Sequence, residues 1–128
     1  MKLFTEEWFN AAVEKLTNDA DFQKKGVGFD SNLHFKVLKD RKAKLSKDVE
    51  FGLWVPQCDK KWFGKKDPDE VDIIFEGKGG TLESVFSGKK NVVMALTMGS
   101  IKLKKGSLAK LTGNLGAVNR FIEILGSV

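Results

Sequence analysis

The chain's only cysteine and only histidine, Cys58 and His34, are the two residues that could form a thiol–imidazole pair for nucleophilic catalysis. Apolar and polar residues alternate in the two stretches around them, which predicts a β-hairpin. One allowed register aligns Phe35 with Leu53. In it His34 lies opposite Trp54, and Cys58 is about four residues further on, on the order of 13 Å along the strand. We therefore expect His34 to be a surface residue away from Cys58, and no catalytic residue.

Four carboxylates lie close together and raise the question of a metal site: Asp67, Asp69, Glu70 and Asp72. Their spacing does not match a calcium-binding loop, because Val71 occupies a ligand position, and no histidine is nearby. One cysteine and one histidine cannot complete a structural zinc site either. These acidic residues are therefore interpreted as charges that flank a strand, and no metal is expected.

The run Gly77-Lys78-Gly79-Gly80-Thr81 lies at a predicted strand-to-helix turn, the kind of place where helix amides bind phosphates. It fits neither nucleotide fingerprint, because the dinucleotide motif needs a glycine where Leu82 stands and a P-loop needs Gly-Lys-Thr at the helix start. The favoured interpretation is a flexible turn in which Thr81 caps the next helix. The weaker alternative is that this turn, or Lys89 and Lys90, contacts phosphates. No cofactor is expected.

The composition is that of one ordinary globular domain. With 128 residues, of which 41% are hydrophobic and 30% charged, the chain is long enough for one core and short for two. No apolar run is long enough to cross a bilayer, and the first residues turn acidic before an apolar signal region develops. A single cysteine suits a reducing compartment, so we expect a cytoplasmic protein.

Lysines give the chain a net charge of +5, which attracts phosphates, anionic lipids and nucleic acids alike. They gather in two runs, 36–47 and 60–66, which a meander places at opposite ends of the sheet. We therefore expect no continuous nucleic-acid-binding stripe. The first run is interpreted as a solvated hairpin tip. The second contains Trp62 and Phe63 between lysines, and the hypothesis for it is transient contact with an anionic membrane surface.

The periodicity of the chain alternates between helical and strand-like. In the hairpin, only registers that set Phe35 against Phe51 or Leu53 keep the apolar side chains on one face. Strands joined by hairpins, with helices before and after, favour an α+β fold with the helices on one face of the sheet. The stretch 91–98 is almost wholly apolar, which predicts a buried helix. The predicted helices cover 5–16, 20–26, 81–88, 91–98, 108–111 and 115–125, the predicted strands 33–37, 49–55, 71–75 and 101–104, and a lysine-rich connection 59–70.

The second half of the chain contains a series of motifs at regular spacing. They are Val71-Asp72-Ile73-Ile74-Phe75, the short helix to Phe86, Gly88-Lys89-Lys90-Asn91, the apolar helix to Met98, and Gly99-Ser100-Ile101-Lys102-Leu103-Lys104. In their order and spacing they resemble the C-terminal half of sterol carrier protein type two domains. Two departures are an extra residue at Lys104-Lys105-Gly106 and a longer, more basic connection over 58–69.

The resemblance implies one lipid-binding domain over residues 1–128, with a mixed, mainly antiparallel five-stranded sheet, helices on one face and an enclosed apolar tunnel. Such domains carry sterols, fatty acids or fatty acyl-CoA without covalent chemistry, so the expected partner is an apolar or acyl-chain small molecule. Lys89 and Lys90 are candidates for contact with acyl-CoA phosphates or a membrane. The candidate wall residues of the cavity are Phe9, Val13, Phe35, Phe51, Phe75, Phe86, Met94, Met98, Leu115 and Phe121.

A filled interior is the alternative for these apolar positions, since a helical stripe of apolar side chains is usually just core. The chain would then be an interaction domain whose lysine-rich loops bind a protein or nucleic acid. An enzyme is not expected, because no nucleophile, base and orienting group can be assembled from the sequence. Ligand binding that changes little with salt distinguishes a carrier from charge-driven binding.

Overall fold

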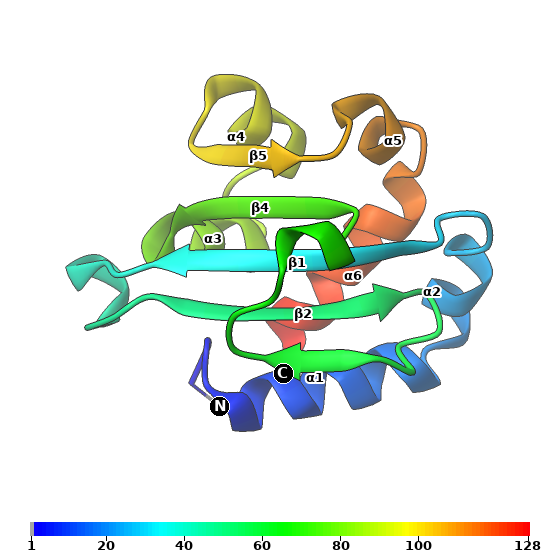
Figure 1. The fold of residues 1–128 in the computed structure, drawn as a ribbon, viewed down its shortest axis with the longest axis horizontal. Coiled ribbons are helices and arrows are strands. Elements are labelled where there is room, and N and C mark those ends of the chain that lie inside the picture. Colours follow the sequence, from blue (N-terminus) through cyan, green and yellow to red (C-terminus); the bar gives the residue numbers. More distant parts are fainter. Residues whose placement is uncertain (1) are drawn as a thin grey trace.

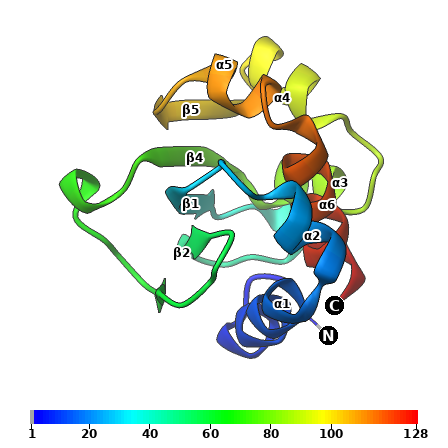
Figure 2. The same cartoon turned by 90° about the vertical axis from the view of Figure 1, so that its right-hand side faces the viewer.

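The computed structural model describes residues 2–128, which form a five-stranded mixed sheet with the helices on one side of it (Figures 1 and 2). The strand order is β3-β2-β1-β4-β5, in which β1 and β4 are parallel and the other neighbours antiparallel. This confirms the expected α+β class and sheet. The elements are α1 Glu6–Asn18, α2 Ala20–Lys25, β1 Ser31–Leu38, η1 Arg41–Ala43, β2 Val49–Val55, β3 Lys61–Phe63, η2 Pro68–Glu70, β4 Ile73–Lys78, α3 Gly79–Phe86, α4 Val92–Met98, β5 Ile101–Lys105, α5 Leu108–Thr112 and α6 Leu115–Ser127.

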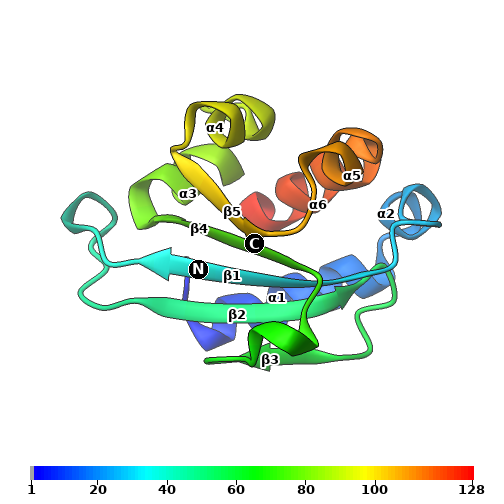
Figure 3. The same ribbon diagram turned by 45° about the horizontal axis from the view of Figure 1, so that its top comes forward.

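The helices divide into two groups along the sheet. Helices α1, α2, α3 and α6 form a layer behind the sheet, in which α3 lies against β4 and β1, whereas the short helices α4 and α5 flank the edge strand β5 (Figure 3). None of the helices within residues 2–128 is long and apolar enough to cross a membrane.

The register of the hairpin is one of the two that the sequence allows. Phe35 pairs with Phe51, and on its other side Phe35 lies beside Phe75 of the parallel strand β4. The ring centroids of Phe35 and Phe75 are 4.8 Å apart, those of Phe35 and Phe51 5.3 Å, and those of Phe35 and Phe121 of α6 5.9 Å. Because side chains on a strand alternate between faces, this register sends the neighbouring charged residues to the face without helices.

The first helix forms as its sequence predicts. The side-chain oxygen of Thr5 accepts a hydrogen bond from the amide of Trp8, which satisfies one of the free donors at the helix start. The predicted apolar stripe, which includes Trp8 and Phe9, is buried. The indole of Trp8 donates to the carbonyl of Leu125 at 3.1 Å and so joins the first helix to the last.

One strand lies inside the lysine-rich connection over 59–70. Strand β3 pairs with β2 through Phe63 opposite Phe51, and the Phe63 ring packs 6.0 Å from that of Phe9. The sequence analysis did not identify this strand, because three residues with a lysine among them are too short to show an alternating pattern. Its pairing on the edge of the sheet is decided by β2, not by its own sequence.

The prediction that His34 is a surface residue is wrong. The residue is only 3% exposed, because the Trp62 ring stacks against its ring on the face without helices. The indole of Trp62 donates to Nδ1 of His34 at 2.9 Å, so Nδ1 is the acceptor and Nε2 carries the proton that it donates to Glu50, also at 2.9 Å. His34 lies opposite Gly52, not Trp54, since the hairpin adopts the Phe51 register.

Gly52 has no side chain at the point where Trp62 crosses the sheet. A Cβ atom at this position would collide with the six-membered ring of Trp62 and with the carbonyl oxygen of Leu33. We expect Gly52→Ala to lower the free energy of unfolding by about 1–3 kcal/mol, because the indole must move off His34. Urea unfolding measures the loss. Gly116→Ala is the matched control: its nearest neighbours are Lys25 side-chain carbons at 3.6 and 3.9 Å, so its stability should be unchanged or raised. Equal effects of the two substitutions would contradict the role of Gly52.

A carboxylate and a guanidinium connect the first two helices with the last. Arg120 of α6 donates through Nη2 and Nε to the two oxygens of Asp19, at 2.7 and 3.0 Å. Asp19 also caps α2 by accepting from the amide of Phe22 at 2.7 Å. The bond from Arg120, followed by the one from Phe22, lowers the pKa of Asp19 from 3.8 to about 2.

The lowered pKa of Asp19 determines how the stability of the fold changes with pH. Because the folded-state pKa is below the ordinary value, the charged Asp19 stabilises the fold above about pH 4, and this stabilisation is lost as the pH falls toward 2. We expect Asp19→Asn to have a lower melting temperature than the parent at pH 5, with the difference shrinking by pH 2. Thermal unfolding at both pH values tests it. A difference that stays constant over this range would mean that Asp19 acts by packing alone.

Candidate ligand-binding cavity

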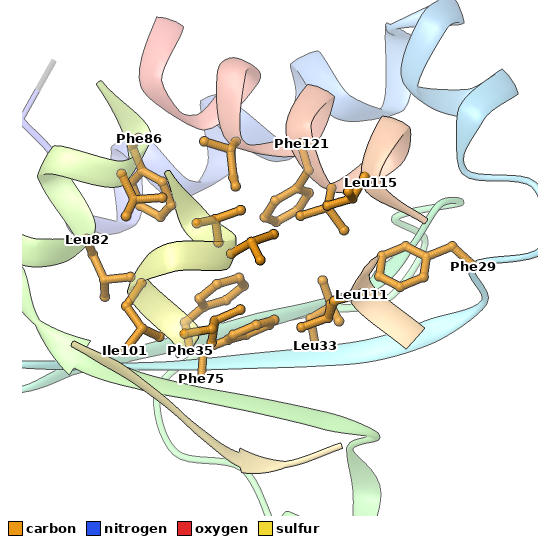
Figure 4. A pocket seen from close by; sticks show the side chains of 16 residues that line it. Phe29, Leu33, Phe35, Phe75, Leu82, Phe86, Ile101, Leu111, Leu115 and Phe121 are labelled. Atoms are coloured by element: carbon orange, nitrogen blue, oxygen red, sulfur yellow. The ribbon is translucent and has the colours of Figure 1, made fainter. Parts of the chain in front are cut away.

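An apolar cavity lies between the sheet and the helices of the second half of the chain (Figure 4). Phe35 and Phe75 lie on the sheet at its floor, and Phe86 and Phe121 lie on the opposite side (Figure 4). Every residue of the lining is apolar. The wall consists of Phe29, Leu33, Phe35, Phe75, Leu82, Val85, Phe86, Val92, Val93, Leu96, Ile101, Leu111, Leu115, Val118, Phe121 and Ile122.

The cavity is narrow. Its side chains leave about 590 Å³ unoccupied by protein atoms, solvent at its mouth included, but the centre of a water-sized molecule can reach only about 40 Å³ of it. That is enough for a few water molecules and too little for a lipid chain. A larger apolar guest therefore requires some of the wall to move.

Helix α4 is one of the two short helices in the wall, and it contributes three residues to the lining, against one from α5. It has seven residues, of which only Ala95 is buried, and it lies between Gly88 and Gly99. Both glycines have left-handed backbone angles, with φ of +82° and +81°, which side chains other than glycine rarely adopt. A helix this short gains little from its own hydrogen bonds, so its position depends on the side chains that it packs into the cavity wall.

Half of the ten predicted wall residues line this cavity: Phe35, Phe75, Phe86, Leu115 and Phe121. Phe9, Val13 and Phe51 are buried in the core but are not part of the lining. Phe9 and Phe51 pack against one another at 5.1 Å, in the part of the core that α1 covers.

The prediction of a buried helix over 91–98 is wrong for its outer side. Met94 and Met98 are 60% and 74% exposed, and neither lines the cavity. Val92, Val93 and Leu96 face the cavity instead. The helix is apolar around its whole circumference, so its periodicity could not indicate which side is buried; its place beside the edge strand decides that.

Several other wall residues were not predicted as such, among them Phe29, Leu111 and Ile122. Leu111 and Ile122 belong to apolar stripes that the sequence does show. Phe29 precedes β1 and carries no periodic signal, because it stands alone between glycines and polar residues. It reaches the wall only because the chain turns there from α2 to β1 (Figure 4).

The aromatic residues of the second lysine run are engaged by the fold. Phe63 packs on the core, and Trp62 stacks on His34 with the Lys66 ammonium 4.8 Å above its ring. Lys89 and Lys90 are exposed and lie beside the outer side of α4. Of the four residues that the sequence offered for a phosphate or membrane contact, only these two lysines remain free of such packing.

The glycine-rich run forms no separate turn. Strand β4 extends to Lys78, and α3 begins directly at Gly79, so Thr81 lies inside the helix and does not cap it. The amide of Gly80 donates to the Asp40 carboxylate at 2.9 Å, and this bond lowers the pKa of Asp40. The anion at the start of α3 is therefore a side chain of the protein itself.

The two remaining candidates for catalysis, Cys58 and His34, are each engaged in other contacts. Cys58 is buried, its Sγ–H donates to the carbonyl of Pro56 at 3.3 Å, and burial raises the pKa of the thiol to about 11. Both ring nitrogens of His34 are occupied by Trp62 and Glu50. Within residues 2–128 no group of three or more potential metal ligands is found.

The fold and the cavity together define the class of this protein: an α+β domain that encloses an apolar space between its sheet and its helices. A crystal structure of sterol carrier protein 2 matches it with a TM-score of 0.84 and 28% sequence identity, covering 98% of each chain. A conserved hypothetical protein from Thermus thermophilus, described as possibly a sterol carrier protein, matches with a TM-score of 0.82 and 27% identity, covering 99% of this chain and 90% of its own.

A more distant structure, palmitated SCP2L2 from Aedes aegypti, has a TM-score of 0.60 and 17% identity, covering 93% of this chain and 95% of its own. No family model and no curated protein matches the chain. The structural matches confirm the resemblance predicted from the motifs of the second half. The chain has the sterol carrier protein 2 fold.

Proposed function

We propose that this protein binds the hydrocarbon part of a lipid in the apolar cavity and carries it without changing it chemically. The observation that carries the proposal is the lining, whose sixteen side chains are all apolar. A polar group brought into such a space loses its hydrogen bonds to water and finds no replacement, at a cost of roughly 2–7 kcal/mol. The polar head of the ligand therefore stays at the mouth while its chain lies inside.

The narrow space favours a slender ligand. Because the walls stand close together, a flexible acyl chain can enter with less displacement than a rigid sterol ring system. Outward movement of α4 would admit it, since this helix is short, lies between two glycines and contributes Val92, Val93 and Leu96 to the wall. We infer that a fatty acid or fatty acyl-CoA is the preferred class of ligand, with a sterol-like molecule as the alternative.

The proposal covers residues 1–128 as one carrier domain. Its likeness to sterol carrier protein 2 extends over 98% of both chains, which supports a lipid carrier over an enzyme. The alternative of an interaction domain with a filled interior is the less favoured of the two, because the structural likeness is to a sterol carrier protein.

Titration with a fluorescent fatty acid tests the proposal. We expect saturable binding of about one ligand per chain, because the apolar side chains line one narrow cavity, which a single acyl chain would fill once its wall has moved outward. Val118→Phe places a ring in the cavity and should weaken this binding at least tenfold, equivalent to about 1.4 kcal/mol. Val13→Phe is the matched control: Val13 is buried on α1 outside the cavity, so the same enlargement should cost stability and leave the affinity of folded protein unchanged.

Three results would contradict the proposal. They are no binding by the parent, equal binding by Val118→Phe, and binding that weakens steeply with added salt, since burial of a hydrocarbon chain is nearly independent of ionic strength. Displacement by palmitate, palmitoyl-CoA and cholesterol in parallel identifies the ligand class. Near-ultraviolet circular dichroism confirms that each variant is folded.

A further inference from the structure

One long segment of the protein carries basic residues and no acidic ones. Between Glu83 and Glu123 the sequence has no acidic residue. Of the chain's 22 basic residues seven lie in this stretch, and the other 15 are outnumbered by its 17 acidic residues. The stretch contains α4, β5 and α5, which lie together at one edge of the sheet (Figures 1 and 3). The seven are Lys89, Lys90, Lys102, Lys104, Lys105, Lys110 and Arg120.

Two exposed methionine side chains lie on the outer side of α4, within this basic segment. Met94 and Met98 are one helical turn apart and are 60% and 74% exposed. They line one surface hollow together with Lys89 and Lys90. Within residues 2–128, neither of these lysines takes part in an ion pair. Large apolar side chains beside free cations are typical of surfaces that insert into anionic membranes.

The inner side of α4 forms part of the cavity wall. Val92, Val93 and Leu96 face the cavity, so only the thickness of α4 separates the exposed methionines from the proposed ligand space. Whatever attracts the outer side of α4 therefore acts directly on a short helix of the cavity wall.

We propose that α4 is the docking element for an anionic lipid bilayer. Met94 and Met98 insert among the lipid chains, and Lys89 and Lys90 contact the charged headgroups. Because the bilayer draws α4 outward, the cavity opens toward the membrane and a lipid passes between the two without crossing water. This inference rests on the proposed function, since it supplies the route by which the cavity is loaded.

Other occupants fit this surface less well. A second copy of the chain would bring two segments of like charge together, which opposes association. A nucleic acid would use the lysines but gain nothing from methionines, since base stacking requires aromatic rings. The earlier hypothesis of membrane contact through Trp62 and Phe63 is replaced, because both rings are held by His34 and by the core.

The test is flotation of the ligand-free protein with vesicles of phosphatidylcholine alone or with about one third phosphatidylglycerol. We expect binding to the anionic vesicles only. The double substitution Met94→Gln and Met98→Gln should reduce partitioning at least tenfold, while glutamine preserves helix propensity. Lys89→Glu with Lys90→Glu should have a similar effect.

Matched controls separate α4 from general properties of the surface. Val27→Gln removes a side chain that is 78% exposed, next to α2, and should leave vesicle binding unchanged. Lys24→Glu with Lys65→Glu reverses the same number of charges on α2 and beyond β3, both away from α4 (Figure 1). It should weaken binding much less than Lys89→Glu with Lys90→Glu.

The outcomes distinguish this inference from the proposed function. If the parent binds a soluble fatty acid but no vesicle, or if the glutamine variant floats like the parent, docking by α4 is overturned and the carrier function stands. If the parent instead binds anionic vesicles through α4 but binds no fatty acid, docking by α4 stands and the carrier function is overturned. Sedimentation velocity tests whether a second copy of the chain occupies this face instead. A dimer of the parent that dissociates in the glutamine variant would assign the face to a second copy and overturn membrane docking.

Discussion

The stack of phenylalanine rings at the centre of the sheet is the interaction on which the rest of the structure depends. Phe35 lies between Phe51 and Phe75, and Phe121 of the last helix stacks on it. The stack fixes an antiparallel pairing on one side of β1 and a parallel pairing on the other. A shift of one residue in either pairing would turn a charged neighbour such as Glu50 toward the helices, so the register is strongly specified.

The core is filled on one side of this stack and hollow on the other. Beneath α1 the large rings of Trp8 and Phe9 occupy the space, and α1 is joined to α6 by a buried indole hydrogen bond. Beside β5 the covering helices have only seven and five residues, and a narrow apolar cavity lies between them and the sheet. The proposed carrier function needs this thinner side to open while the side beneath α1 holds the fold together.

Polar contacts reinforce the frame and leave the cavity apolar. The Asp19–Arg120 pair lies where α2 meets α6, and the Trp62–His34–Glu50 chain lies on the face of the sheet without helices. Neither contributes an atom to the cavity lining. Because the wall has no polar group to fix a head group or a ring system, the proposed carrier would discriminate among ligands by the width of the cavity and by the surface around its mouth. That makes the charged outer side of α4 as important as the wall itself.

The sequence by itself determined the elements with enough length to show a period, the hairpin register up to a choice between Phe51 and Leu53, and the likeness to the sterol carrier protein fold through the order of its motifs. It also identified five of the sixteen wall residues. Only the tertiary structure decided that β3 is a strand, that Trp62 buries His34, and that Met94 and Met98 face outward. The physical reason is the same in each case: a pattern of apolar residues records a preference for burial, whereas the partner and the side are set by elements distant in the sequence.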